Sequence, residues 1–165
     1  CGKTTLLRLL AGELLPQAGN LQLGPQRLAD DAQNYRRQLF RTDPASGAFD
    51  ALTPMQWFDG LRGLHDAFDM VLAHALLGRL FLREHLHKTG HMLSTGSRRK
   101  VWLVAALASN APLVLIDQPF AALDAPSIRA VTDLLQEVGC SGQRIVILAD
   151  HEAPPGLQLS QVLTL

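Results

Sequence analysis

The chain opens with residue types that can bind a phosphate group. Its first residues, Cys1-Gly2-Lys3-Thr4-Thr5, match the second half of the phosphate-loop pattern G-x-x-x-x-G-K-[ST]. The glycine lets successive backbone N–H groups point at phosphate oxygens, Lys3 adds a positive charge, and the Thr4 hydroxyl can bind Mg²⁺. Leucines at helical spacing follow, so the loop opens a helix whose N-terminus favours anions. A helix cap that binds no ligand is the alternative interpretation of this half-motif.

A second group that can bind a metal follows an apolar run. Val114-Leu115-Ile116-Asp117 has the pattern of a buried parallel strand that ends in a carboxylate. Ligand sites of α/β proteins form at the C-terminal edges of such strands, so Asp117 is a candidate to hold Mg²⁺, through water. An Asp that only caps the following turn is the alternative interpretation.

The elements that must position these residues alternate between helices and strands. We expect helices at 4–14, at several places within 53–88, at 94–108, and at 125–138 with a stop at Gly139. We expect strands at 19–24, 38–41, 112–117, 144–149 and 161–165, and a loop at 25–37. This alternation predicts an α/β core, with a helical subdomain inserted at 45–92.

The composition limits the class of protein. The length of 165 residues suits one domain with a substantial core. Fifteen basic and fifteen acidic side chains cancel, so we expect no nucleic-acid partner. Two cysteines form no disulfide framework, and no apolar stretch is long enough to span a bilayer. The first glycine of the phosphate loop would precede Cys1, so we expect an N-terminally truncated fragment.

Three later motifs carry a specific resemblance. The segment Leu93-Ser94-Thr95-Gly96-Ser97 resembles the L-S-G-G-Q signature of ATP-binding-cassette (ABC) ATPases. The run from Asp117 to Asp124 resembles the family's D-E-P-x-x-A-L-D, and Ala149-Asp150-His151-Glu152 resembles its histidine loop. The interval from Ser94 to Asp117 is the one that this family uses. With the phosphate loop, four motifs occur in the family's order, so the chain is identified as a member.

The resemblance implies a P-loop NTPase fold with an ABC-type core sheet and an inserted helical subdomain, in one domain over 1–165. It implies that residues Cys1 to Thr5 hold the phosphates of ATP. Thr4 and Asp117 would hold Mg²⁺, and His151 would contact the γ-phosphate.

The resemblance also implies a second cassette as partner. In this family two cassettes pack head to tail, and each signature motif binds the other cassette's ATP. Ser94, Thr95 and Gly96 would therefore serve the partner's nucleotide, and Asp124 would cross the interface near the opposite site. A helix N-terminus with a hydroxyl is physically suited to such an anion site.

Two departures from the family pattern concern the chemistry. The residue after Asp117 is Gln118, where the family has the Glu that accepts a proton from the attacking water. General-base contributions are about 10²–10⁴-fold, so we expect impaired but not absent hydrolysis. A Gln that orients the water without taking its proton is the alternative, as in GTPases. Thr42 stands where the family has a Gln that touches Mg²⁺ and couples ATP to the membrane partner.

The leading functional prediction is the ATP-binding subunit of an ABC transporter. It would couple ATP binding and hydrolysis to solute transport by separate transmembrane permease subunits, from the cytoplasmic face of the plasma membrane. Its compact spacing is similar to that of the haem-exporter ATPases of cytochrome c biogenesis. The alternatives are a slow or non-catalytic cassette in which ATP only clamps a dimer, motivated by Gln118, and a soluble ABC ATPase outside transport.

Other candidate residues favour structural roles. The spacing of His85, His87 and His91 places no two on one helix face at i, i+4, so we expect solvated histidines rather than a metal site. The basic run Arg98-Arg99-Lys100 is expected to face solvent or phosphate. Trp57 and Phe58 are expected in the core.

Overall fold

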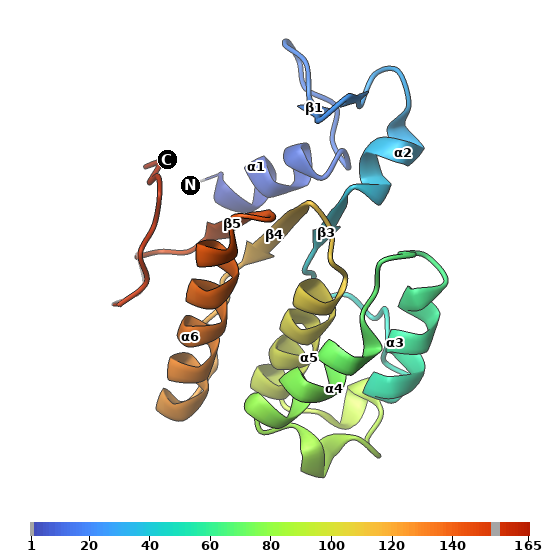
Figure 1. Cartoon of the computed structure of the whole chain (residues 1–165), viewed down its shortest axis with the longest axis vertical. Coiled ribbons are helices and arrows are strands. Elements are labelled where there is room, and N and C mark those ends of the chain that lie inside the picture. The colour runs from blue at the N-terminus through green and yellow to red at the C-terminus, as the bar shows by residue number, and fades with distance from the viewer. Residues whose placement is uncertain (1, 153–155) are drawn as a thin grey trace.

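The computed structural model describes residues 2–152 and 156–165, and its centre is a parallel sheet (Figure 1). Within these residues the sheet has the order β3 (Leu39–Arg41), β4 (Leu113–Asp117), β5 (Ile145–Ala149). Phe40 is in register with Val114, and Val114 with Val146. The central strand β4 is buried from Leu113 to Ile116 because layers of helices cover both faces.

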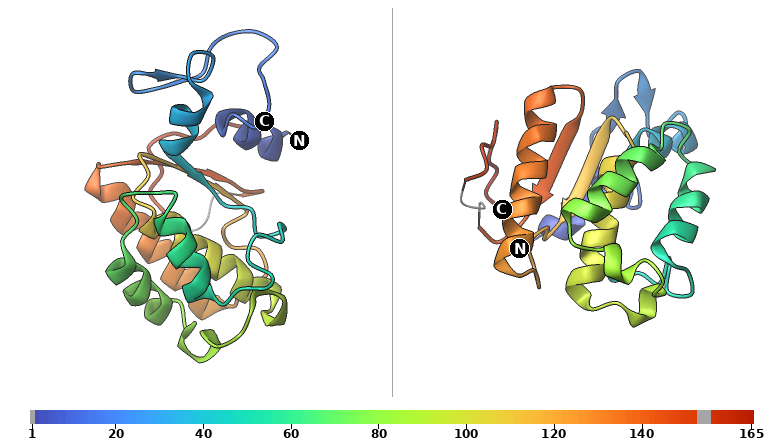
Figure 2. Two further views of the ribbon diagram at one scale, coloured as in Figure 1. Left: turned by 90° about the vertical axis from the view of Figure 1, so that its right-hand side faces the viewer. Right: turned by 60° about the horizontal axis from the view of Figure 1, so that its bottom comes forward.

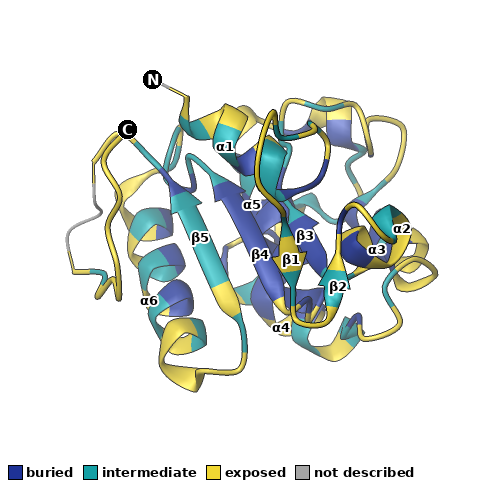
Figure 3. Cartoon of the chain, turned by 90° about the horizontal axis from the view of Figure 1, so that it is seen from above, coloured by how far each residue is buried: buried dark blue, intermediate teal, exposed yellow. Residues whose placement is uncertain are grey.

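The alternating side chains of β4 divide the core into two parts. Leu113 and Leu115 pack with Leu7 of α1 (Lys3–Leu10), which lies on one face of the sheet. Val114 and Ile116 point to the other face and pack with α5 (Thr95–Ala108) and α6 (Ala125–Ser141). Figure 3 shows that β4 is buried along most of its length, and Figure 1 shows α1 on one side of the sheet with α5 and α6 on the other. Because side chains alternate between the two faces of a strand, every second residue of β4 contacts α1, and the residues between them contact α5 and α6.

A group of short helices packs beside α5 (Figure 2). It contains α3 (Pro54–Arg62), α4 (Met70–Arg79), η1 (Arg83–His85) and η2 (Gly90–Met92). Thr53 starts α3 with a capping box to Gln56, and Asp69 caps α4 through the Leu72 N–H. Aromatic rings fill the interior of this group, and Trp57 and Phe58 are buried among them as expected. The limits of a subdomain at 45 and 92 stay a prediction.

The segment 25–37 was expected to be a loop, and this prediction is wrong. It contains β2 (Gln26–Arg27), paired with β1 (Gln22–Leu23), and the short helix α2 (Ala32–Arg37). The side chain of Asp31 caps α2 by accepting from the Asn34 N–H, 3.0 Å away. Tyr35 is its buried residue, and the Tyr35 hydroxyl donates to the Leu10 carbonyl. Because only one of the six residues of α2 is buried, the sequence has no apolar periodicity there that would predict a helix.

Two predicted helix ends and one predicted strand are also wrong. Helix α1 ends at Leu10, because Gly12 takes a left-handed φ of +68° that breaks the helix. Helix α6 continues through Gly139 to Ser141 and ends at Gly142, which has a φ of +63°. Residues 161–165 form no strand. Gly12 and Gly142 stop their helices through a positive φ, whereas Gly139 has no positive φ and stays inside α6.

Candidate nucleotide-binding site

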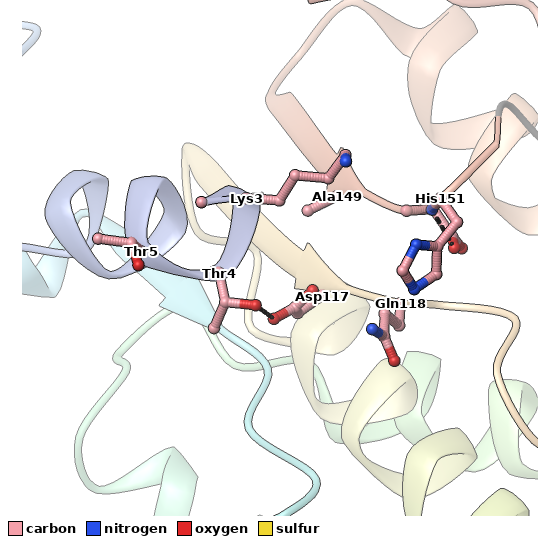
Figure 4. A pocket seen from close by; sticks show the side chains of 9 residues that line it. Lys3, Thr4, Thr5, Asp117, Gln118, Ala149 and His151 are labelled. Carbon is pink, nitrogen blue, oxygen red and sulfur yellow. Dashed lines mark hydrogen bonds between the residues drawn. The ribbon is translucent and has the colours of Figure 1, made fainter. Parts of the chain in front are cut away.

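A cavity of about 220 Å³ lies at the C-terminal edge of the sheet, where α1 begins (Figure 4). Its lining residues are Gly2, Lys3, Thr4, Thr5, Asp117, Gln118, Ala149, Asp150 and His151. The ends of β4 and β5 supply the carboxylates and the imidazole, and the first turn of α1 supplies the lysine and the hydroxyls. The structure thus brings together three of the four motifs found in the sequence.

The N-terminus of α1 is built to receive an anion. Gly2 is its N-cap, with a φ of +108° that favours glycine. A glycine has no side chain to accept hydrogen bonds from the first-turn N–H groups, and the Gly2 carbonyl accepts from Leu6 at 2.8 Å. The positive end of the helix dipole and these N–H groups therefore face the cavity. Lys3 is half-buried at its edge and adds a positive charge.

Two of the three candidate Mg²⁺ ligands contact each other directly. The Thr4 hydroxyl donates to Oδ2 of Asp117 over 2.6 Å. The pair fits the ion, because Mg²⁺ prefers oxygen ligands and is bound through one or two protein groups together with waters and phosphates. Elsewhere in the described ranges 2–152 and 156–165, no cluster of three or more His, Cys, Asp or Glu could hold a metal.

Gln118 and His151 line the same cavity. Gln118 has a left-handed φ of +49°, and its N–H donates to the Ala149 carbonyl at 2.7 Å. His151 is exposed, and its N–H donates to the Asp150 carboxylate at 2.7 Å. Gln118 follows the candidate metal ligand Asp117 directly, so its amide can hydrogen-bond a water in the cavity. An amide hydrogen-bonds such a water without accepting a full proton from it.

Thr42, the third candidate metal ligand, lies outside this cavity. Its side chain is buried, and its hydroxyl accepts from the Asp117 N–H at 3.4 Å and lies 3.5 Å from the Leu115 carbonyl. The hydroxyl therefore joins β3 to β4 in this structure. A contact of Thr42 with Mg²⁺ stays a prediction that would require this hydroxyl to turn. Cys1 lies outside the described residues.

The signature residues lie apart from the cavity. Ser94 caps α5 by accepting from the Ser97 N–H at 3.1 Å, and Ser94 and Thr95 are exposed. Asp124 is exposed at the start of α6, where its carboxylate accepts from the Ser127 N–H at 2.9 Å. This hydrogen bonding with Ser127 lowers the pKa of Asp124. None of these residues lines the cavity that contains Lys3.

The expected exposure of the basic run is wrong. Arg98 donates to the Pro44 and Ser46 carbonyls at 3.3 and 2.6 Å and pairs with Asp50. Arg99 donates to a carbonyl of the loop that follows β4, and Lys100 is buried. All three point inward because α5 is covered on most sides, so that charged side chains must find partners inside the protein.

Sequence reasoning also missed Asp150. It lines the cavity beside His151, and only its place in the histidine-loop segment could have indicated it. The sequence indicated Arg99 only as part of a basic run. In the structure burial lowers the pKa of Arg99, and the carboxylates of Asp117 and Asp150 oppose this lowering.

Comparisons with known proteins agree with this geometry. A family model described as "ABC transporter" matches residues 1–121. A cytochrome c biogenesis ATP-binding export protein, CcmA of Nitrosococcus oceani, is 37% identical over 155 residues, which cover 92% of this chain and 69% of the relative. A taurine import ATP-binding protein, TauB of Chromobacterium violaceum, is 32% identical. The match covers 100% of this chain and 63% of that relative.

Solved structures give the same result for the fold. The ATP-binding subunit of an ABC transporter superposes with a TM-score of 0.80 at 25% identity, over 91% of this chain and 63% of that one. A dimeric ATP-binding cassette in a post-hydrolysis state, bound to ADP and Pi, superposes with a TM-score of 0.78 at 23% identity. The match covers 92% of this chain and 70% of that cassette's chain. The chain thus spans about two thirds of these proteins.

Proposed function

This chain belongs to the ABC transporter family of ATP-binding proteins, and we propose that it binds and hydrolyses ATP to drive transport of a solute. The observation that carries the proposal is the convergence of Lys3, the Thr4–Asp117 pair and Gln118 on one cavity at the start of α1. The combination of phosphate-binding N–H groups, oxygen ligands for a cation and a water-orienting amide fits phosphoryl transfer.

Five side chains of the cavity have roles in this proposal. Lys3 and the N–H groups of the first turn bind the β- and γ-phosphates of ATP. Thr4 and Asp117 hold Mg²⁺, which neutralises charge on the phosphate oxygens. Gln118 orients the attacking water, and His151 contacts the γ-phosphate. Because Gln118 takes no proton, we expect turnover to be slow, by about 10²–10⁴-fold against a cassette that has a carboxylate at this position.

A second cassette completes the proposed site. The dimeric cassettes among the solved structures support such an assembly. Ser94, Thr95 and Gly96 of one copy then face the ATP of the other, and Asp124 lies at the interface. The exposure of Ser94, Thr95 and Asp124 leaves them available for this contact.

We propose that this cassette sits on the inner face of the plasma membrane and that separate permease subunits form the membrane-crossing part of the transporter. Across residues 2–152 and 156–165, the structure has no helix with the length and apolar character that a bilayer requires. Relatives at 32–37% identity include several cytochrome c biogenesis ATP-binding export proteins and one taurine import protein, and we propose export because the export proteins include the 37% identical one. Complementation of a bacterium that lacks such an export protein, scored by its content of c-type cytochromes, tests the direction.

Steady-state ATPase activity of the full-length protein tests the central proposal. Lys3→Ala should abolish turnover that depends on Mg²⁺, while the control Arg62→Ala, at the exposed end of α3, should keep it. Wild-type protein that binds ATP but shows no turnover, and gains it in Gln118→Glu, would instead identify a binding clamp. Wild-type protein that binds no ATP would overturn the proposal.

A further inference from the structure

The first turns of α5 hold the loop that follows β4 in the same chain. The loop runs from Gln118 to Asp124, between the end of β4 and the start of α6. We propose that Arg99 is a positioning residue that fixes this loop, and through it the amide of Gln118, for the attack of water. The proposal rests on the ATPase function given above and adds a residue outside the cavity to it.

The guanidinium of Arg99 contacts the backbone of the loop. Its Nη1 donates to the Ala121 carbonyl, three residues after Gln118. Its Nε is buried and has no hydrogen-bond partner within the described part of the chain. Burial lowers the pKa of Arg99, and the carboxylates of Asp117 and Asp150 act against this effect. The positive charge of Arg99 therefore interacts with two carboxylates of the cavity, although Arg99 does not line the cavity itself.

The loop needs such a restraint because its backbone is in an unfavourable conformation. Gln118 and Ala122 have φ angles of +49° and +60°, a region that residues with a Cβ rarely adopt. Such conformations persist only where the surrounding structure holds them. The hydrogen bonds inside the loop, from Ala121 N–H to the Gln118 carbonyl and from Leu123 N–H to the Phe120 carbonyl, are both long at 3.3 Å.

Two further residues of α5 contact the same segment. A Cβ added to Gly96 would collide with the Ala122 carbonyl oxygen, so the glycine allows the helix and the loop to touch. The buried ammonium of Lys100 donates to the Ser127 hydroxyl at 3.3 Å, just after the loop ends. Residues 96, 99 and 100 share one face of α5, at i, i+3 and i+4. Arg99 is the member of this set with a hydrogen bond to the loop itself.

Kinetics of the full-length protein distinguish positioning from general stability. Arg99→Met should lower kcat by about 10–100-fold, the scale expected when a reacting group is misplaced by about 1 Å, with KM for ATP changed less than about twofold. Arg99→Lys, which keeps the charge and one donor, should recover part of the loss. Arg98→Met is the matched control, because it removes hydrogen bonds from the neighbouring side chain to segment 44–50 and none to the loop.

A double-mutant cycle with Gln118→Ala tests the route of the effect. If Arg99 acts through Gln118, Arg99→Met should change kcat less than about twofold in the Gln118→Ala background. Equal losses in both backgrounds would overturn the proposal.

Hydrogen exchange of the peptide that covers residues 118–124 gives a readout that needs no turnover. Exchange should be faster in Arg99→Met than in wild type and unchanged in Arg98→Met. Unchanged exchange in Arg99→Met would overturn the inference even if the protein hydrolyses ATP. Faster exchange in a protein without ATPase activity would support the restraint by Arg99 and contradict only the proposed function.

Discussion

The Thr4 hydroxyl hydrogen-bonds Oδ2 of Asp117 at 2.6 Å, which links the first turn of α1 to the last residue of β4. Neighbouring ligands of an octahedral Mg²⁺, each about 2.0–2.1 Å from the ion, lie about 2.9 Å apart. If both oxygens bound one ion directly, as we propose for Mg²⁺, they would need to move apart by only a small distance. Their contact keeps both side chains together, where we propose that they would hold Mg²⁺ directly or through water.

Replacing Thr4 by Val should weaken the apparent affinity of the ATPase for Mg²⁺. The variant keeps the shape of the side chain but loses the hydroxyl, so the Mg²⁺ concentration for half-maximal ATPase activity should rise at least 10–100-fold, the scale seen when partners of a metal site are removed. Thr4→Ser keeps the hydroxyl and should stay close to wild type. A Thr4→Val titration that superposes on the wild-type curve would contradict the assignment of this ligand.

Gln118→Glu should raise kcat by about 10²–10⁴-fold, because a carboxylate can accept the proton of the attacking water. The variant should also acquire an acid limb in its pH–rate profile, as protonation removes the base. Gln118→Ala is the matched control and should fall below wild type if the amide orients the water. A wild type as fast as Gln118→Glu would mean that another step limits turnover.

Much of the site could be predicted from local sequence. Asp117 follows an apolar run whose burial required a strand, and Ser94 precedes an apolar helix that needed a cap. The strand that ends at Asp117 and the helix that begins after Ser94 depend on neighbours in the sequence, and both are confirmed; the binding roles of the two residues stay predictions. The convergence of three motifs on one cavity followed from the rule that ligand sites form at the C-terminal edges of parallel strands.

Residues whose surroundings come from distant segments were predicted less well. Arg98, Arg99 and Lys100 read as a solvated run, but segments 44–50 and 121–127 cover them. Leu64 and Val71 fit the helical period of the core, yet they are 70% and 81% exposed. Leu64 lies in the connection between α3 and α4, so the period does not continue through it. Periodicity within one segment cannot show which face another segment will cover.

Two glycine substitutions should change stability in opposite directions. Gly96→Ala places a Cβ against the Ala122 carbonyl, and we expect it to destabilise the protein by about 1–3 kcal/mol. Gly139→Ala adds a methyl group where nothing lies within 4 Å inside α6, and should stabilise by about 0.5–1 kcal/mol. Urea unfolding measures both. Equal effects of the two substitutions would show that α5 does not touch the loop in solution.

His65 should make stability depend on pH. Burial near Phe40, whose ring centroid is 5.5 Å away, lowers the pKa of His65, and the opposing effect of Asp66 is smaller. The unfolded chain, with a histidine pKa of about 6.5, therefore binds the proton more readily than the folded one. The stabilisation is fully present above pH 6.5 and is lost as the pH falls from there through the lower folded pKa.

The difference in unfolding free energy between wild type and His65→Gln isolates this effect from the other titrating groups. That difference should shrink from pH 8 to pH 5. Protonation of His65 is less favourable in the folded wild type than in its unfolded chain, and the Gln variant has no imidazole to protonate. His74→Gln is the matched control, since His74 is an exposed histidine on α4. A wild-type advantage that grows as the pH falls would mean that the protonated imidazole has a partner in the folded protein, and would contradict the burial of His65 as the cause.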